Sequence, residues 1–203
     1  MNPNALKQVE QRLKKAEHAF ARLCETSDLE ETRDAWSDFL TAAATIYNKL
    51  KEGAQTSGSS IGWYGRIKKD RKSDPLLSYV HHARNCDEHG IEEVTQTWTN
   101  HNFVGVGDGP FMGIHTPAGS NISNLVGIRA NGERVPIATY ETRTVRLIPV
   151  TDTIHKDTFD VPDSHLGEKL PETLEPAYVA GIALIYLKDI VEEARNFIQK
   201  PLL

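Results

Sequence analysis

The stretch LKQVEQRLKKAEHAFARL, residues 6–23, decides the fold class of this sequence. Its apolar residues recur every three or four positions, which is the spacing of one face of an α-helix. They are Leu6, Val9, Leu13, Ala16, Phe20 and Leu23. Lysine, glutamine and glutamate fill most of the positions between them, so the stretch predicts a long amphipathic helix. Its apolar stripe needs other helices to cover it.

A second amphipathic helix is predicted directly after the first. Its apolar face runs from Trp36 to Leu50, and Ser27-Asp28-Leu29-Glu30 before it has the spacing of a capping box with Ser27 as the N-cap. Two long helices joined by so short a link favour an antiparallel hairpin. The glycine- and serine-rich segment Gly53–Gly62 predicts a flexible connection after the hairpin.

Asp74-Pro75 predicts the start of a third helix, with Asp as the N-cap and Pro at the first helical position. Gly90 is the residue expected to end that helix. A last helix is predicted over about Pro176 to Gln199, and it is apolar almost all round near Ile182–Leu187. A helix of this kind belongs at the centre of a bundle, so it should pack on the first three.

Between the third and last helices the pattern changes to alternating, threonine- and valine-rich sequence from about Val94. Asn131-Gly132 is the pair typical of a type I′ hairpin turn, Arg143–Val150 predicts another strand, and Asp160–Pro171 predicts a loop. We therefore predict an α+β fold. An antiparallel helical bundle occupies residues 1–92, a β-rich insertion residues 93–167, and the closing helix residues 168–203.

Composition restricts the class of protein. The chain has 203 residues, a formal net charge of -5 and a sequence pI of about 5.9, so any contact with nucleic acid must come from a local basic patch. Two cysteines, Cys24 and Cys86, are too few for a disulfide framework, which favours a reducing cytoplasm. We expect no signal peptide, and the apolar Val179–Leu187 is shorter than the roughly 20 residues of a membrane span.

The sequence Arg84-Asn85-Cys86-Asp87-Glu88-His89 lies at the predicted end of the third helix. An Arg followed at this distance by a His is a common chance pattern, and Arg12 with His18 also fits it inside the first helix, where we assign it no function. The second match differs in its place on the third helix and in the Asn directly after the Arg.

This form of the motif resembles that of HEPN-domain ribonucleases. The order of the helices is also similar, with two long antiparallel helices first, the motif helix third and a closing helix last. The β-rich segment is not part of the resemblance. The resemblance implies an all-helical bundle, usually a homodimer in which two motifs face one cleft, and cleavage of RNA without a metal or another cofactor.

Carried over to this chain, the resemblance implies a role for each motif residue. His89 would be the general base that takes the proton of a ribose 2′-hydroxyl, Arg84 would hold the scissile phosphate, and Asn85 would orient one of them. These roles suit the side chains, because histidine titrates near neutral pH and the arginine fork matches phosphate oxygens. Positions five apart on an ideal helix diverge by about 140°, so a distorted helix end or a second subunit must complete the site.

A structural interpretation of the same residues stays open. Arg84 and Glu88 are four apart and could form an ion pair, and His89 could interact with the C-terminal end of the helix dipole. Asp87 and Glu88 inside the motif would repel a phosphate. In this alternative the chain is a non-catalytic bundle whose β insertion binds a protein or a small ligand.

Two further groups of residues have functional and structural interpretations. The basic run after Trp63-Tyr64 would bind RNA through Arg66, Lys68, Lys69 and Arg71, or it is a solvated helix face. The histidines around the motif, His81, His82 and His89, could help to hold a transition metal, although they are more typical of exposed helix residues. A metal-dependent hydrolase is therefore the third hypothesis, and we expect no metal site.

The leading hypothesis is a HEPN-like, metal-independent RNA endonuclease that acts as a homodimer. RNA and a cognate antitoxin or other protein are its expected partners. A toxin–antitoxin or defence role is implied by the resemblance alone.

Overall fold

The computed structural model describes residues 1–89, 93–105, 111–115, 126–152, 156–172 and 175–199. These residues form two compact units, Met1–Gln96 together with Val145–Leu203, and Thr97–Thr144. Residues 145–167, assigned to the insertion by sequence, are grouped with the helices.

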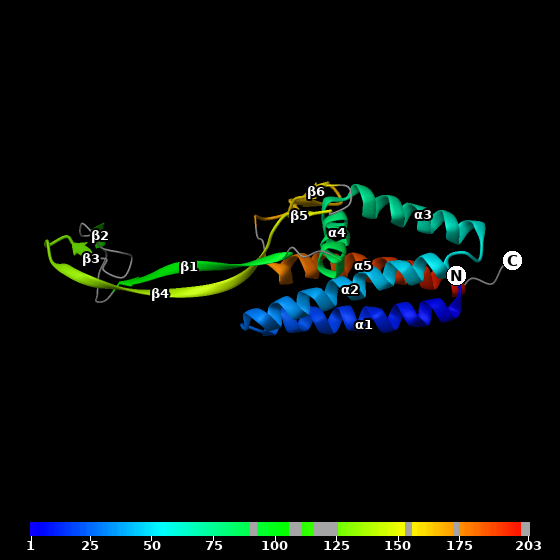
Figure 1. Cartoon of the computed structure of the whole chain (residues 1–203), viewed down its shortest axis with the longest axis horizontal. Helices are drawn as coiled ribbons and strands as arrows, with labels where there is room; N and C mark the ends of the chain where they lie inside the picture. Colours follow the sequence, from blue (N-terminus) through cyan, green and yellow to red (C-terminus); the bar gives the residue numbers. More distant parts are fainter. Residues whose placement is uncertain (90–92, 106–110, 116–125, 153–155, 173–174, 200–203) are drawn as a thin grey trace. The chain divides into compact units, whose positions relative to one another are not determined.

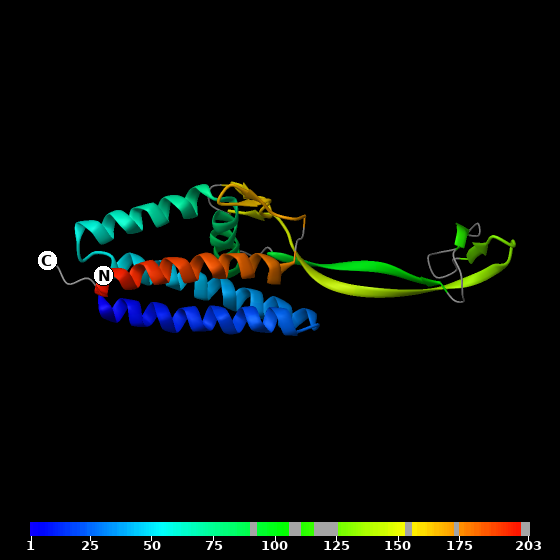
Figure 2. The same ribbon diagram turned by 180° about the vertical axis from the view of Figure 1, so that it is seen from behind.

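The described residues of the first unit form five helices. They are α1 (Pro3–Glu25), α2 (Leu29–Gly53), α3 (Gly58–Ser73), α4 (Pro75–His89) and α5 (Pro176–Gln199). Figures 1 and 2 show α1, α2 and α5 running side by side, with α4 lying across α2 and α5, and α3 above α5. Together with the antiparallel strands this confirms the α+β class, and α5 begins and ends where the sequence predicted.

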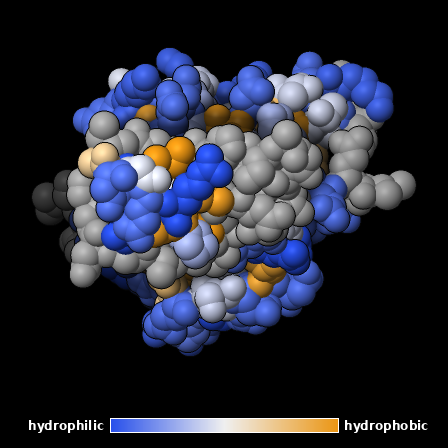
Figure 3. Space-filling model, turned by 90° about the vertical axis from the view of Figure 1, so that its left-hand side faces the viewer, coloured by the Kyte–Doolittle hydropathy of each residue, from blue (hydrophilic) through white to orange (hydrophobic). Residues whose placement is uncertain are grey.

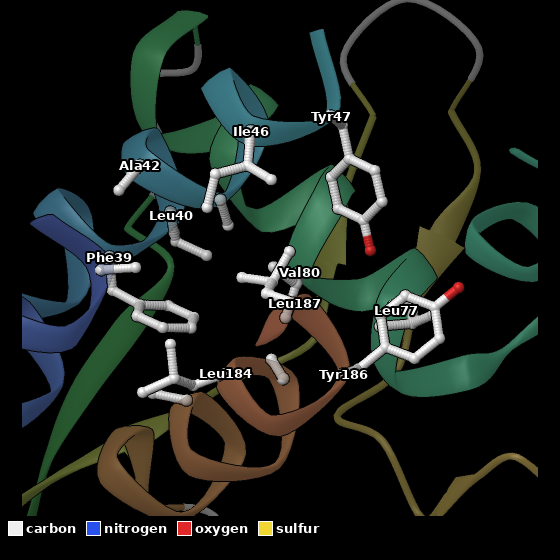
Figure 4. Packing of buried hydrophobic residues seen from close by; sticks show 14 of the residues in the cluster. Phe39, Leu40, Ala42, Ile46, Tyr47, Leu77, Val80, Leu184, Tyr186 and Leu187 are labelled. Atoms are coloured by element: carbon white, nitrogen blue, oxygen red, sulfur yellow. The ribbon is translucent and has the colours of Figure 1, made fainter. Parts of the chain in front are cut away.

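The helical core forms where α2, α4 and α5 meet. Figure 4 shows Phe39 and Leu40 of α2 facing Leu184 of α5, while Val80 of α4 lies beside Leu187 of α5. Phe39, Leu40 and Leu187 are at most 1% exposed. Burying a side chain of this size contributes roughly 1.5–3 kcal/mol, so these contacts fix the helices relative to one another.

The predicted capping box at Ser27 is wrong. The N-cap of α2 is Asp28, whose carboxylate accepts the N–H of Glu31 at 2.8 Å. Aspartate is as good an N-cap as serine, and a cap at residue 28 serves the first turn of a helix that begins at Leu29.

The prediction of a flexible connection over Gly53–Gly62 is also wrong, because α3 begins at Gly58. Ser57 and Ser60 form a reciprocal capping box at its start, and the Ser60 hydroxyl donates to the carbonyl of Ala54 at 2.6 Å. Trp63 and Ile67 on its inner face are buried. Capping and burial together offset the low helix propensity of the glycines in this segment.

Two small antiparallel sheets pack on α4 in the same unit. One pairs β5 (Val150–Thr151) with β6 (Thr158–Phe159), and the other pairs β7 (Ser164–His165) with β8 (Glu168–Lys169). The second sheet lies within the predicted loop Asp160–Pro171, so that prediction is wrong for these four residues. Leu166 and Gly167 turn the chain between them with φ of 49° and 87°.

The second unit is built on an antiparallel sheet with strand order β1-β4-β3-β2. Its strands are β1 (Thr95–Gly105), β2 (Phe111–His115), β3 (Val126–Arg129) and β4 (Arg134–Leu147), and β1 and β4 begin or end within the helical unit. The predicted strand Arg143–Val150 is the end of β4 followed by the start of β5.

The hairpin between β3 and β4 is present, but its turn is not type I′. A type I′ turn needs positive φ at both central residues, and in this hairpin only Gly132 has it, at 79°. The Gly132 N–H donates to the Arg129 carbonyl at 2.9 Å, and the Arg129 N–H donates to the Glu133 carbonyl at 3.0 Å. The connection is thus a three-residue loop in which the glycine takes the left-handed position.

In the described part of the chain, no helix has both the length and the apolar character needed to cross a lipid bilayer. On the face drawn in Figure 3, hydrophilic residues cover most of the coloured surface and apolar ones form small patches between them.

Asp74 joins the helices to the second small sheet. It ends α3 and is the N-cap of α4, as predicted, and its Oδ1 accepts the N–H of Leu77 at 2.9 Å. The same carboxylate accepts the N–H of Leu166 at 2.6 Å through Oδ2 and lies 3.0 Å from Nδ1 of His165 through Oδ1. Its side chain is only 5% exposed, so every one of these partners replaces water.

We expect Asp74→Ala to lower the free energy of unfolding by about 3 kcal/mol, because the change removes a helix cap and leaves buried donors without an acceptor. Urea denaturation followed by circular dichroism measures the loss. Asp34→Ala, at an exposed position of α2, is the control and should change the free energy by less than about 0.5 kcal/mol. Equal losses for the two variants would contradict a central role for Asp74.

Candidate functional site

The helix that bears the motif is fixed on two sides. On one side, the Ser37 hydroxyl of α2 donates to Asp87 Oδ2 at 2.5 Å. On the other, the Cys86 thiol donates to the Thr151 carbonyl at 3.2 Å, and the Tyr79 hydroxyl donates to the Ile148 carbonyl at 2.8 Å. The last turns of α4 are therefore held between α2 and the chain around β5.

Arg84 lies in this held segment and has two side-chain partners. Its Nη2 forms an ion pair with Glu88 Oε2, and its Nη1 donates to Asn85 Oδ1 at 3.3 Å. Nε is enclosed and has no hydrogen-bond partner among the described residues. The Arg84 side chain is 25% exposed, so part of the guanidinium still reaches solvent.

The histidine of the motif is the last residue of α4. The side chain of His89 lies outside the described residues. The proximity of Arg84 and His89 therefore stays a prediction.

The two carboxylates inside the motif, Asp87 and Glu88, each have a partner within the helical unit. Asp87 accepts the Ser37 hydroxyl, and Glu88 carries the opposite charge to Arg84 across one helix turn. The charge of Glu88 is thus balanced within the helix, which reduces the repulsion of a phosphate that the sequence predicts.

His81 is a candidate that sequence reasoning did not select for catalysis. It is three residues before Arg84 and half-buried, and burial lowers its pKa to about 4, with Arg71, His82 and Arg84 adding to the effect through their positive charge. Its imidazole is therefore neutral at pH 7. The spacing from Arg84 was visible in the sequence, but the approach of Arg71 from α3 was not.

The predicted RNA-binding run divides into two groups on α3. Lys68 and Lys69 are exposed, as an RNA-binding surface requires. Arg66 instead forms ion pairs with Glu193 of α5 and Asp70, and the Arg71 guanidinium carbon lies 4.7 Å from the ring centre of Tyr47. Arg66 and Arg71 thus already have partners within the protein, although Arg66 is exposed.

The histidines do not assemble a metal site in the described part of the chain. His82 stacks on Phe159 with ring centres 3.5 Å apart, and burial lowers its pKa. His165 contacts Asp74, and His101 lies 3.4 Å from Glu141. Among the described residues no three His, Cys, Asp or Glu side chains converge, so the metal-hydrolase hypothesis gains no support.

Away from the motif helix α4, the surface has hollows beside α1. An apolar one of about 520 Å³ lies between α1 and α5, where Ile185 is 63% exposed. A basic one of about 300 Å³ lies between α1 and α2.

No family model, curated protein or solved structure matches this chain.

We expect the His81 imidazole to titrate near pH 4 in NMR spectra of the folded chain. Removing a neighbouring positive charge, as in Arg84→Met or Arg71→Met, should raise that pKa, because fewer cations then oppose protonation. Since the pKa is lowered on folding, His81 also makes the fold less stable as the pH falls from about 6.5 to about 4.

The matched control is Lys51→Met, which removes a positive charge at an exposed position of α2. It should leave the His81 titration unchanged. A wild-type midpoint near the ordinary value of about 6.5 would contradict the buried, cation-rich setting of this histidine.

Proposed function

We propose that this chain is a HEPN-like ribonuclease that cleaves RNA without a metal, with Arg84, Asn85 and His89 in the roles that the resemblance implies. The observation that carries the proposal is the hydrogen bond from Arg84 Nη1 to Asn85 Oδ1. It matches the orienting role expected of Asn85. An arginine held by an amide at a partly exposed helix end can present its remaining N–H groups to a phosphate.

The reaction needs one proton acceptor and one anion-stabilising group. His89 removes the proton from a ribose 2′-hydroxyl, and the 2′-oxygen attacks the adjacent phosphorus. The bond to the 5′-oxygen of the next nucleotide breaks, and that oxygen takes up a proton from water, while His89 releases the proton it accepted to solvent. Arg84 stabilises the added negative charge on the phosphoryl oxygens. The products end in a 2′,3′-cyclic phosphate and a 5′-hydroxyl.

Homodimerisation and RNA binding complete the proposal. Because Arg84 and His89 are five residues apart on one helix, their side chains diverge, and a second copy that brings its own motif to the cleft completes the site. Lys68 and Lys69 are exposed and supply cations for the RNA backbone.

We expect the full chain to cleave a mixed RNA pool in EDTA and to leave 2′,3′-cyclic phosphate ends. Arg84→Ala and His89→Ala should each lower the rate by about 100-fold or more, because each removes a group needed in the transition state. Asn85→Ala should lower it by about 10-fold, since it only loosens Arg84. Gel analysis of end-labelled RNA measures the rates.

Lys51→Ala is the matched control for the loss of a surface cation and should cleave at the wild-type rate. Thermal unfolding by circular dichroism shows whether each variant is folded. Absence of cleavage by the wild type would contradict the ribonuclease proposal. Cleavage that survives both Arg84→Ala and His89→Ala in folded protein would contradict it too.

A second candidate function is a non-catalytic bundle that binds a protein or a small ligand. The ion pair between Arg84 and Glu88 favours it, because the pair gives Arg84 a structural role.

Glu88→Gln separates the two candidates. In the ribonuclease the change frees Arg84 and removes a negative charge, so RNA affinity should rise several-fold in fluorescence anisotropy. In a non-catalytic bundle RNA affinity should not change. Glu52→Gln, which alters an exposed carboxylate paired with Lys49, is the matched control.

A further inference from the structure

The hollow between α1 and α2 is basic on its α1 side. Its volume is about 300 Å³, and Asp38, Thr41 and Ala42 of α2 form the opposite wall. Four basic side chains of α1 line it: Arg12, Lys15, His18 and Arg22. Successive members are three or four residues apart, so they form one row along the helix.

The one carboxylate in the lining, Asp38, shares an arginine with a second carboxylate. Asp38 Oδ2 accepts a hydrogen bond from Arg22 Nη1 at 2.5 Å. Arg22 is also bound to Glu31, whose Oε1 lies 2.6 Å from its Nε. Arg22 is therefore fully engaged by two acidic partners and brings no net positive charge to the hollow, because one guanidinium and two carboxylates together carry a net charge of -1.

The other three basic side chains differ from Arg22. Arg12, Lys15 and His18 have no ion pair or side-chain hydrogen bond with any residue in the described ranges. Lys15 and His18 are exposed, and Arg12 is half-buried. The hollow thus holds two permanent positive charges and an imidazole that are paired with no carboxylate within the described ranges, while Asp38 in its lining is bound to Arg22.

We propose that this hollow between α1 and α2 binds a phosphate group, carried either by a nucleic acid strand or by a small phosphate compound. Arg12 donates its fork of N–H groups to two phosphate oxygens, and Lys15 supplies a point charge beside them. His18 donates one further hydrogen bond. The site is separate from the α4 motif and does not depend on the proposed ribonuclease activity.

Phosphate suits this set better than a carboxylate does. A phosphate monoester offers three terminal oxygens to donors along one helix face, and a nucleic acid strand presents further phosphates beside the first, whereas a carboxylate offers only two oxygens in one plane. The chain as a whole carries a net charge of -5, so a local row of unpaired cations is the kind of patch needed to hold a polyanion.

The test uses the full chain in EDTA. Inorganic phosphate is titrated into labelled protein and followed by NMR at His18, against sodium chloride at equal ionic strength. In parallel, the affinity for a fluorescent single-stranded RNA is measured by anisotropy at several salt concentrations. The variant is Arg12→Ala/Lys15→Ala, and the matched control, Lys7→Ala/Lys51→Ala, removes two exposed lysines of the same helix pair.

We expect phosphate to give saturable shifts at His18 that the variant loses and the control retains. If the natural source is a nucleic acid, phosphate competes with the RNA. The variant then weakens RNA binding by about 10-fold more than the control, and the slope of log affinity against log salt falls by roughly 1.4 for two lost contacts.

Saturable phosphate shifts with equal RNA affinity in variant and control would assign the site to a small phosphate compound. Absence of saturable shifts, together with equal RNA affinity in the two double variants, would overturn the proposal. The phosphate titration of the wild type stands even if the variant fails to fold. Loss of RNA cleavage in the α4 variants bears only on the ribonuclease proposal.

Discussion

The arrangement of the helical unit depends on one buried carboxylate. Asp74 caps α4 at Leu77 N–H, and it also binds the N–H of Leu166 and the ring of His165. The end of α3, the start of α4 and the β7–β8 turn thus share one acceptor that is almost excluded from water. Because Asp74 fixes the start of α4, it also helps to fix the position of the Arg84 motif further along the same helix. A buried charge with several good donors holds geometry more strictly than apolar packing does, since no alternative partner is at hand.

Sequence patterns predicted the elements whose causes are local. The apolar period of α1 and α5 and the Asp74-Pro75 start of α4 need no distant partner, and the structure has all three. The start of α3 was missed for a physical reason. Its glycines predict a loop, and its capping box uses Ser60 in place of the usual Glu or Gln at that position. The burial of Trp63 against Phe197 of α5, which helps to hold the helix, is a long-range contact that no local pattern contains.

The candidate site shows the same division between local and distant contacts. The Arg84–Glu88 pair follows from a spacing of four on one helix, and it is the ion pair that the structural interpretation of the motif predicted. The bond from Ser37 to Asp87 joins residues on two helices, and the approach of Arg71 to His81 joins two others. These contacts arise only once α2, α3 and α4 have packed, so neither could be found in the order of residues.

The ion pair between Arg84 and Glu88 is compatible with phosphate binding. Both side chains are partly exposed, at 25% and 31%, and such a pair within one helix contributes only about 0.3–0.5 kcal/mol. A charge-assisted hydrogen bond from the same guanidinium to a phosphate is worth about 1.5–3 kcal/mol. A phosphate that reaches Arg84 would therefore displace Glu88 at little cost, while the hydrogen bond to Asn85 keeps the guanidinium in place. On this comparison, the ion pair with Glu88 would not prevent Arg84 from binding a phosphate.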